Sequence, residues 1–230
     1  KRWAEGRPLG PMDGIPLSIK DIVAMKNWPT LSGSKTVDTN GPFDEDAPAV
    51  ARLREGGAVI LGKTTTPEFG WKGMTDSPLA GITRNPWNPA HTSGGSSGGA
   101  AASLAAGIGA IAYGTDGGGS IRIPSNYCGV YGIKPTYGRV PHAPNDRPFS
   151  TISSGGPIAR TVTDAALFLN VITQPDDRDW RALPPDGRDY RIGLDDGVRG
   201  LRIAYAPALG GAEVAAEILA ATDQAVRVFQ

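Results

Sequence analysis

Residues 110–124 read AIAYGTDGGGSIRIP, an apolar run that leads into three successive glycines, Gly117 to Gly119, and then Ser120. The run AIAYGTD predicts a strand, and three bare glycine backbones after it predict a turn whose N–H groups can point at one oxygen. Such a turn can stabilise the oxyanion of acyl transfer, and Ser120 is placed to attack the same carbon. An anion-binding nest or a simple tight turn is the alternative interpretation of this stretch alone.

Periodic segments on both sides of this stretch predict helices that alternate with strands. Residues 46–56, DAPAVARLREG, predict a short helix with Asp46 as N-cap and Gly56 at its end, followed at 58–64 by AVILGKT as a buried strand. Further helices are predicted from AAASLAAGIGA (100–110), RTVTDAALFLNVIT (160–173) and EVAAEILAATDQAVRVFQ (213–230), and a strand from RGLRIAYAP (199–207). This alternation predicts an α/β layer architecture around a mostly buried sheet.

The composition excludes several classes of partner. Lys plus Arg and Asp plus Glu are equal at 23 each, so no net charge attracts nucleic acid or an anionic membrane. No apolar run approaches the roughly 20 residues that span a bilayer. The single cysteine, Cys128, excludes an internal disulfide and favours a reducing, cytoplasmic location.

The domain organisation is predicted to be that of one partial domain over residues 1–230. Residues 174–196 are charged and rich in proline, which predicts a surface connection. The sequence starts without Met and stops at Gln230 inside a predicted helix, so both ends are expected to be cuts.

Several segments match a known motif letter for letter, but the residues around them do not suit the structure that the motif requires. GAVILGKT at 57–64 spells the phosphate-binding loop, but its four interior residues belong in a sheet and Pro67 follows too soon for a helix, which argues against a nucleotide-binding protein. The two histidines, His91 and His142, are expected on polar turns, so the general base must be sought elsewhere. No spacing of His, Cys and carboxylates predicts a metal site or a cofactor.

Two further segments complete the chemical pattern. GGSSGG at 94–99 stands inside the domain, where a flexible linker does not fit, and GIPLSIKDI at 14–22 places Lys20 in an apolar run. With GTDGGGSIRIP, and in this order, these segments resemble the amidase signature family. AVILGKTTTPEF, NPWNP, CGVYGIKPTYGRVP and GPIARTVTDAALFL are also similar to family sequence, so the resemblance covers nearly the whole chain; Gly117 departs from it, since many members carry a larger residue there.

The resemblance implies a fold and a catalytic triad. The fold is a single α/β domain around a mixed, mostly parallel, twisted sheet covered by helices, of which this chain is roughly the N-terminal half. Ser120 is the implied nucleophile, and Ser96, held by a cis peptide bond after Gly95, would relay its proton to Lys20. Burial of Lys20 is expected to lower its pKa, with Asp21 on the opposite face of the strand.

Further residue roles follow from the same resemblance. The backbone amides of Gly117, Gly118, Gly119 and Ser120 are the implied oxyanion hole. Asp116 and Arg122 are expected to brace this loop. Pocket-wall backbone is suggested at Gly70, Trp71 and Lys72, and Cys128 is expected to be a small buried residue.

The implied reaction is hydrolysis of a carboxylic amide through an acyl-serine, which releases ammonia or an amine. The alternative within the family is the glutaminase subunit of a tRNA-dependent amidotransferase. Such subunits typically read SLDQ where this chain reads ISSG at 152–155, which favours a stand-alone amidase acting on a small-molecule amide. The amide itself is not readable from the sequence, and a homodimer is left open.

Overall fold

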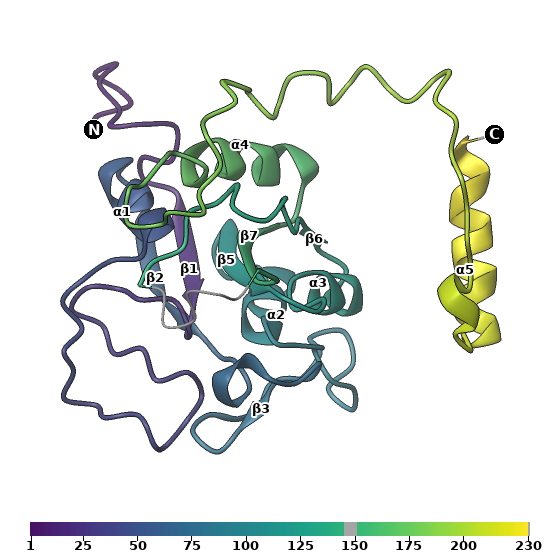
Figure 1. Ribbon diagram of the computed structural model, residues 1–230, viewed down its shortest axis with the longest axis horizontal. Coiled ribbons are helices and arrows are strands. Elements are labelled where there is room, and N and C mark those ends of the chain that lie inside the picture. Colours follow the sequence, from purple (N-terminus) through teal and green to yellow (C-terminus); the bar gives the residue numbers. More distant parts are fainter. Residues whose placement is uncertain (145–150, 230) are drawn as a thin grey trace. The chain divides into compact units, whose positions relative to one another are not determined.

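The computed structural model describes residues 1–144 and 151–229 (Figure 1). The chain divides into two compact units, residues 1–191 and residues from 192 onward. The division lies within the expected surface connection at 174–196. Residues up to 191 belong to the first unit, where the Leu183 N–H donates to the Gly138 carbonyl over 2.8 Å.

The first unit is built on a sheet with strand order β2 (Val59–Thr64), β1 (Pro16–Lys20), β5 (Ile111–Asp116), β7 (Ser154–Ala159) and β6 (Tyr131–Gly132). Strand β1 pairs in parallel with both β2 and β5, whereas β7 is antiparallel to β5 and β6. Among these strands β7 therefore runs against the other four, which confirms the mixed, mostly parallel sheet. A separate two-stranded sheet joins β3 (Asp76–Ser77) to β4 (Gly81–Ile82).

Helices cover both faces of the sheet, as Figure 1 shows for α4 and for α2 with α3. Helices α1 (Pro48–Glu55) and α4 (Val162–Ile172) pack with Leu17, Ile19 and Tyr113 in one cluster. Helices α2 (Gly98–Ala105) and α3 (Arg122–Cys128) lie over the other face, with Ala112 in a second cluster. Because side chains alternate along a strand, the odd residues of β1 face the first cluster and Lys20 faces α2.

Two local expectations are corrected. Helix α1 has Ala47 at its N-cap position, because the Asp46 carboxylate accepts instead from the Lys26 N–H over 2.7 Å and pairs with Arg54. Strand β2 is partly exposed, with Val59 and Leu61 47% and 49% accessible. The physical reason is that β2 is the edge strand of the sheet and pairs with β1 alone among the described residues.

The second unit lacks the expected strand. Residues 201–206 have no regular structure, because no other strand of the described part of this unit offers them backbone partners. The expected helix is present as α5 (Ala216–Val226), followed by a 3₁₀ turn at Arg227–Phe229, and none of their residues is buried.

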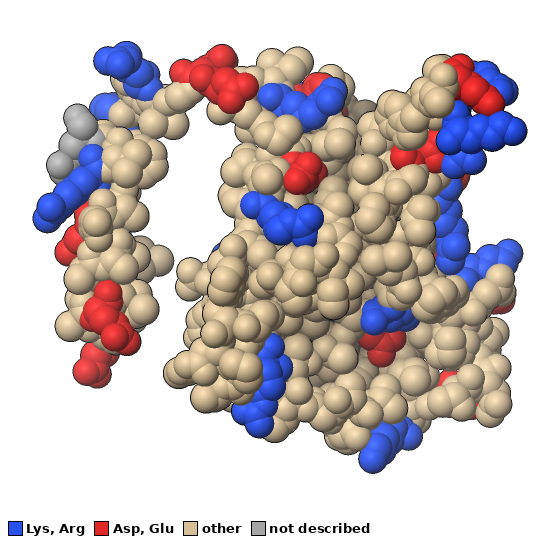
Figure 2. Space-filling model, turned by 180° about the vertical axis from the view of Figure 1, so that it is seen from behind, with Lys and Arg blue, Asp and Glu red and all other residues tan. Residues whose placement is uncertain are grey.

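The charge on the surface and the length and apolar character of the helices are relevant to binding of nucleic acid and of membranes. In Figure 2, basic and acidic side chains are scattered over a mostly uncharged face, in keeping with the equal numbers of the two charges. No helix in the described part of the chain combines the length and the apolar character needed to cross a membrane.

Candidate active site

Lys20 is fully buried at the end of β1. Its Nζ donates to Ser96 Oγ over 2.7 Å and to Thr115 Oγ1 over 3.0 Å. Because β1 and β5 are parallel neighbours, their carboxyl ends meet at one edge of the sheet, which brings Thr115 to the amine. The structure thus unites Lys20 and Ser96, two of the residues predicted from sequence.

The environment of Lys20 favours the neutral amine. Burial lowers the pKa of Lys20 from 10.5 to about 7, and the charge of Asp116 opposes that shift. Asp21 points away from the Lys20 amine, as expected: its carboxylate accepts from the Leu31 N–H and pairs with Lys63. Near neutral pH a large fraction of Lys20 can therefore accept a proton.

The GGSSGG segment is a packed turn ahead of α2. The Gly95–Ser96 peptide bond is cis, as the resemblance implied. A Cβ on Gly95 would lie 2.7 Å from the backbone of Met74, so only glycine fits there. The next residue ties this turn to the glycine loop, because the Ser97 N–H donates to the Ser120 carbonyl over 3.0 Å.

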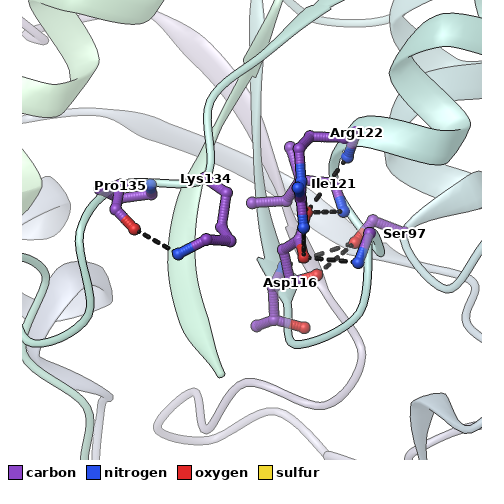
Figure 3. Close-up of polar contacts among 8 residues, drawn as sticks. Ser97, Asp116, Ile121, Arg122, Lys134 and Pro135 are labelled. Atoms are coloured by element: carbon purple, nitrogen blue, oxygen red, sulfur yellow. Dashed lines mark hydrogen bonds and ion pairs between the residues drawn. The ribbon is translucent and has the colours of Figure 1, made fainter. Parts of the chain in front are cut away.

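Asp116 organises the loop that carries Ser120 (Figure 3). Its fully buried carboxylate accepts from the N–H groups of Gly119 and Ile121 over 2.7 and 3.1 Å, and from two side-chain nitrogens of Arg122, both at 2.9 Å. Burial raises the pKa of Asp116, but the hydrogen bonds from Arg122 and the backbone amides outweigh it and hold the pKa at about 2. The loop is thus closed around a charged carboxylate.

This arrangement distinguishes among the amides predicted to form an oxyanion hole. The Gly119 N–H is turned to Asp116, and Gly119 is not among the pocket-lining residues. Gly117, Gly118 and Ser120 do line the pocket. Within the described residues, none of the hydrogen bonds uses their three N–H groups as donors.

A pocket of about 470 Å³ lies in front of these groups. Ser96, Thr115 and Ser120 are on its surface together, and apolar side chains form much of the remaining wall: Ile22, Phe69, Ile123, Val140 and Ile152. The segment suggested as pocket wall, Gly70, Trp71 and Lys72, also lines it. Asp116 and Arg122 do not.

Sequence reasoning missed part of this wall. Thr115 lay inside the quoted motif, but nothing in its type or position indicated a contact with Lys20. His142 was expected on a polar turn, yet it lines the pocket, and its N–H donates to Asp179 over 2.8 Å. His91 is exposed in a turn. Only chain folding brings 137–142 and 179–181 to the pocket, so no local signal could have found them.

The structure shows the surroundings of the GAVILGKT segment and of Cys128. Residues 59–64 of GAVILGKT form β2 rather than a phosphate-binding loop, and the Lys63 Nζ donates to the Val23 carbonyl over 2.8 Å. Cys128 is fully buried, which confirms the expectation of a small core residue, and burial raises its pKa to about 11. Within the described residues, no three His, Cys, Asp or Glu side chains gather as metal ligands.

Comparison with known proteins shows which family the chain is similar to. The sequence model of the family described as Amidase matches residues 1–230. An acylamidase of Rhodococcus erythropolis is 44% identical over 98% of this chain and 47% of its own length. A Chloroflexus aurantiacus protein that bears the name of a glutamyl-tRNA(Gln) amidotransferase component is 44% identical over 88% of this chain and 42% of its own length.

Solved structures agree. A bacterial aryl acylamidase described as an amidase signature enzyme superimposes with a TM-score of 0.88 at 37% identity, over 99% of this chain and 47% of its own. The chain therefore spans about half the length of the curated relatives it matches. Because the family model matches residues 1–230 and the relatives and solved structures are similar to this chain, the chain belongs to the Amidase family, the amidase signature enzymes.

Proposed function

We propose that the protein hydrolyses a carboxylic amide through an ester formed on Ser120, and releases ammonia or an amine. The observation that carries this proposal is the contact of 2.7 Å between the buried Lys20 amine and Ser96 Oγ, on the same pocket as Ser120. A serine hydroxyl is a weak nucleophile and needs a base. A lysine whose pKa is about 7 can be that base at neutral pH.

The proposed acylation step moves one proton along two hydroxyls. The Ser120 Oγ attacks the amide carbon while its proton passes to Ser96 Oγ, and the Ser96 proton passes to the Lys20 Nζ. The lysine then becomes an ammonium, which the negative charge of Asp116 favours. Amides of Gly117, Gly118 and Ser120 would receive the oxyanion, since Gly119 already donates to Asp116.

Collapse of the tetrahedral intermediate breaks the C–N bond. The proton held on Lys20 returns through Ser96 to the leaving nitrogen, so the amine departs neutral. Water then attacks the ester carbon while the same relay takes its proton; the C–Oγ bond breaks, the relay returns that proton to Ser120 Oγ, and the acid is released. In this scheme Thr115 is a positioning residue, because its hydroxyl holds the Lys20 Nζ toward Ser96.

The glutaminase subunit remains the second candidate, because relatives that bear the amidotransferase name are as similar as the acylamidase. The ISSG sequence at 152–155 favours the stand-alone amidase and supplies Ile152 and Ser153 to the pocket wall. A screen of aliphatic, aryl and amino-acid amides against the full-length enzyme separates the two, since a glutaminase would prefer glutamine. The single buried cysteine fits a reducing compartment, so we place the protein in the cytoplasm.

The nucleophile is tested with a fluorophosphonate probe on the full-length enzyme. We expect the label on Ser120, and Ser120→Ala should abolish both labelling and amide turnover. Ser103→Ala is the matched control, because that part-buried serine on α2 lies outside the pocket and bonds to the Ala100 carbonyl. Labelling of Ser96 or Ser97 with Ser120 left free would overturn the assignment.

A further inference from the structure

Thr75 bonds to both ends of the turn that carries Ser96. The residue is buried, with 2% of its surface accessible. Its Oγ1 donates to the Gly94 carbonyl over 2.8 Å and accepts from the Gly98 N–H over 3.1 Å. Gly94 and Gly98 stand two positions before and two positions after Ser96. One hydroxyl therefore closes the turn, with its proton on one side and a lone pair on the other.

The bond to Gly98 takes the place of a local cap on helix α2. The first N–H groups of a helix have no partner within the helix. Ser97 stands at the N-cap position, but its side chain makes no capping bond and donates instead to the Thr115 carbonyl over 3.2 Å. The Gly98 N–H is satisfied by Thr75, from a segment outside the helix. The helix start that follows Ser96 is thus fixed by a contact distant in sequence.

The glycines of the turn fit closely against the segment that carries Thr75. A Cβ on Gly98 would lie 2.2 Å from the Thr75 Oγ1, and a Cβ on Gly95 would lie 2.7 Å from the Met74 backbone. The Thr75 carbonyl accepts from the Thr83 N–H over 2.8 Å, so the backbone behind the hydroxyl is itself held. The turn and this segment therefore pack as one unit.

A neighbouring serine does not duplicate the contact. The Ser93 Oγ lies 3.3 Å from the Gly94 carbonyl, but the Thr83 carbonyl, at 3.1 Å, is its nearer acceptor. A serine hydroxyl has one proton to donate. In the described part of the chain the pocket wall includes Ser96 but not Thr75, so any effect of Thr75 on the reaction must pass through the turn.

We propose that Thr75 is a positioning residue that holds the Ser96 Oγ within reach of the Lys20 amine. The proposal rests on the proton relay of the proposed function. The contact of 2.7 Å between Ser96 Oγ and Lys20 Nζ depends on where the turn lies, and a misplacement of about 1 Å in a catalytic group can cost about a hundredfold in rate. Without the hydroxyl, the Gly94 carbonyl and the Gly98 N–H lose this partner, and the turn shifts to find others.

The test measures how fast a fluorophosphonate labels Ser120 in the full-length wild type and in Thr75 variants. Labelling needs the same relay, because the Ser120 Oγ attacks phosphorus and fluoride leaves while the Ser120 proton passes to Ser96. Thr75→Val keeps the shape and removes the hydroxyl. It should lower the maximal labelling rate about tenfold or more, with the half-saturating probe concentration changed by less than about twofold. A maximal rate within about twofold of the wild type would overturn the proposal.

Three variants separate the hydroxyl from general damage to the fold. Thr75→Ser keeps the hydroxyl and should label within about threefold of the wild-type rate, and a loss as large as that of Thr75→Val would contradict the proposal. Thr75→Ala removes the hydroxyl without adding a methyl group, and should show the same loss if Thr75→Val does not fold. Thr66→Val is the matched control, because Thr66 is buried outside this pocket and its hydroxyl has no hydrogen-bond partner among the described residues. It should label at the wild-type rate, and an equal loss there would also count against a specific role of Thr75.

An unfolding measurement separates this inference from the proposed reaction. Urea unfolding at pH 8 of the full-length wild type, Lys20→Met, Ser96→Ala and the double variant gives the coupling between the two side chains without any turnover. The same cycle in the Thr75→Val background should show less than about half of that coupling. Such a loss supports the inference even if the probe does not label Ser120 and the proposed function fails. Equal coupling in the two backgrounds overturns the inference and leaves the proposed function intact.

Discussion

Replacing Lys20 by Met tests the central claim that this lysine is neutral in the folded protein. In the unfolded chain the amine has a pKa of 10.5, and burial lowers it to about 7. Between these values the folded state binds fewer protons than the unfolded state, so the free energy of unfolding rises with pH across this window and is independent of Lys20 below it. The stability linked to Lys20 is complete above pH 10.5 and is lost as the pH falls to about 7.

The magnitude follows from the shift. Each pKa unit corresponds to about 1.4 kcal/mol, so Lys20 should add about 3–4 kcal/mol to the free energy of unfolding between pH 7 and pH 10. Lys20→Met has no such term. It also loses the hydrogen bonds to Ser96 and Thr115, each of which contributes about 1 kcal/mol, but that loss does not depend on pH in this range.

The assay is urea unfolding of the full-length wild type and of Lys20→Met at pH 7 and pH 10. Contributions from other titrating groups cancel in the difference between the two proteins, which leaves the 3–4 kcal/mol expected for Lys20. In parallel, wild-type kcat/KM should rise from acid toward an apparent pKa of about 7 and then level off. A pH-dependent difference below about 1 kcal/mol would mean that Lys20 keeps its charge on folding, and the base assignment would then fail.

Three further predictions concern the loop and the core. Asp116→Asn should lower the free energy of unfolding by about 2–4 kcal/mol and strongly reduce kcat, because the backbone N–H groups that donate to this carboxylate, and Arg122, would lose their buried anionic partner. In the wild type, urea unfolding at a series of pH values should show that the stability contributed by Asp116 is lost as the pH falls from 3.8 through about 2. Gly119→Ala should destabilise by about 1–3 kcal/mol, since its φ is +114° and a Cβ would lie 2.8 Å from a neighbouring side chain, whereas Gly118→Ala, with open space, should unfold at the wild-type urea concentration. Cys128, whose pKa burial raises to about 11, should resist a disulfide reagent at pH 8 until urea unfolds the protein, and rapid reaction of the native protein would contradict its burial.

Helices α1, α2, α4 and α5 and strands β1, β2 and β5 could be predicted from sequence because their signals are local, whereas α3 and the strands β3, β4, β6 and β7 were not predicted. Alternation in GIPLSIKDI and AIAYGTD, and the 3.6-residue period of 160–173, depend on neighbours within a few positions. The failed expectation for Asp46 has a cause outside its own turn, which local sequence does not show. Asp46 looked like a helix cap, but the Lys26 N–H and Arg54, distant in sequence or on a later turn, hold its carboxylate.

For the site, the chemical groups and their order can be read from the sequence: a lysine in an apolar strand, serines in a glycine-rich turn, and a serine after three glycines. Which of these groups meet depends on how the chain folds. Lys20 contacts Ser96, 76 residues away, and Thr115, 95 residues away; the contact with Thr115 arises because parallel pairing of β1 with β5 aligns their ends at one sheet edge. The structure likewise turned the Gly119 N–H to Asp116 and brought Arg181 to the pocket. Such contacts depend on strand order and on the packing of distant segments, which a local sequence period does not encode.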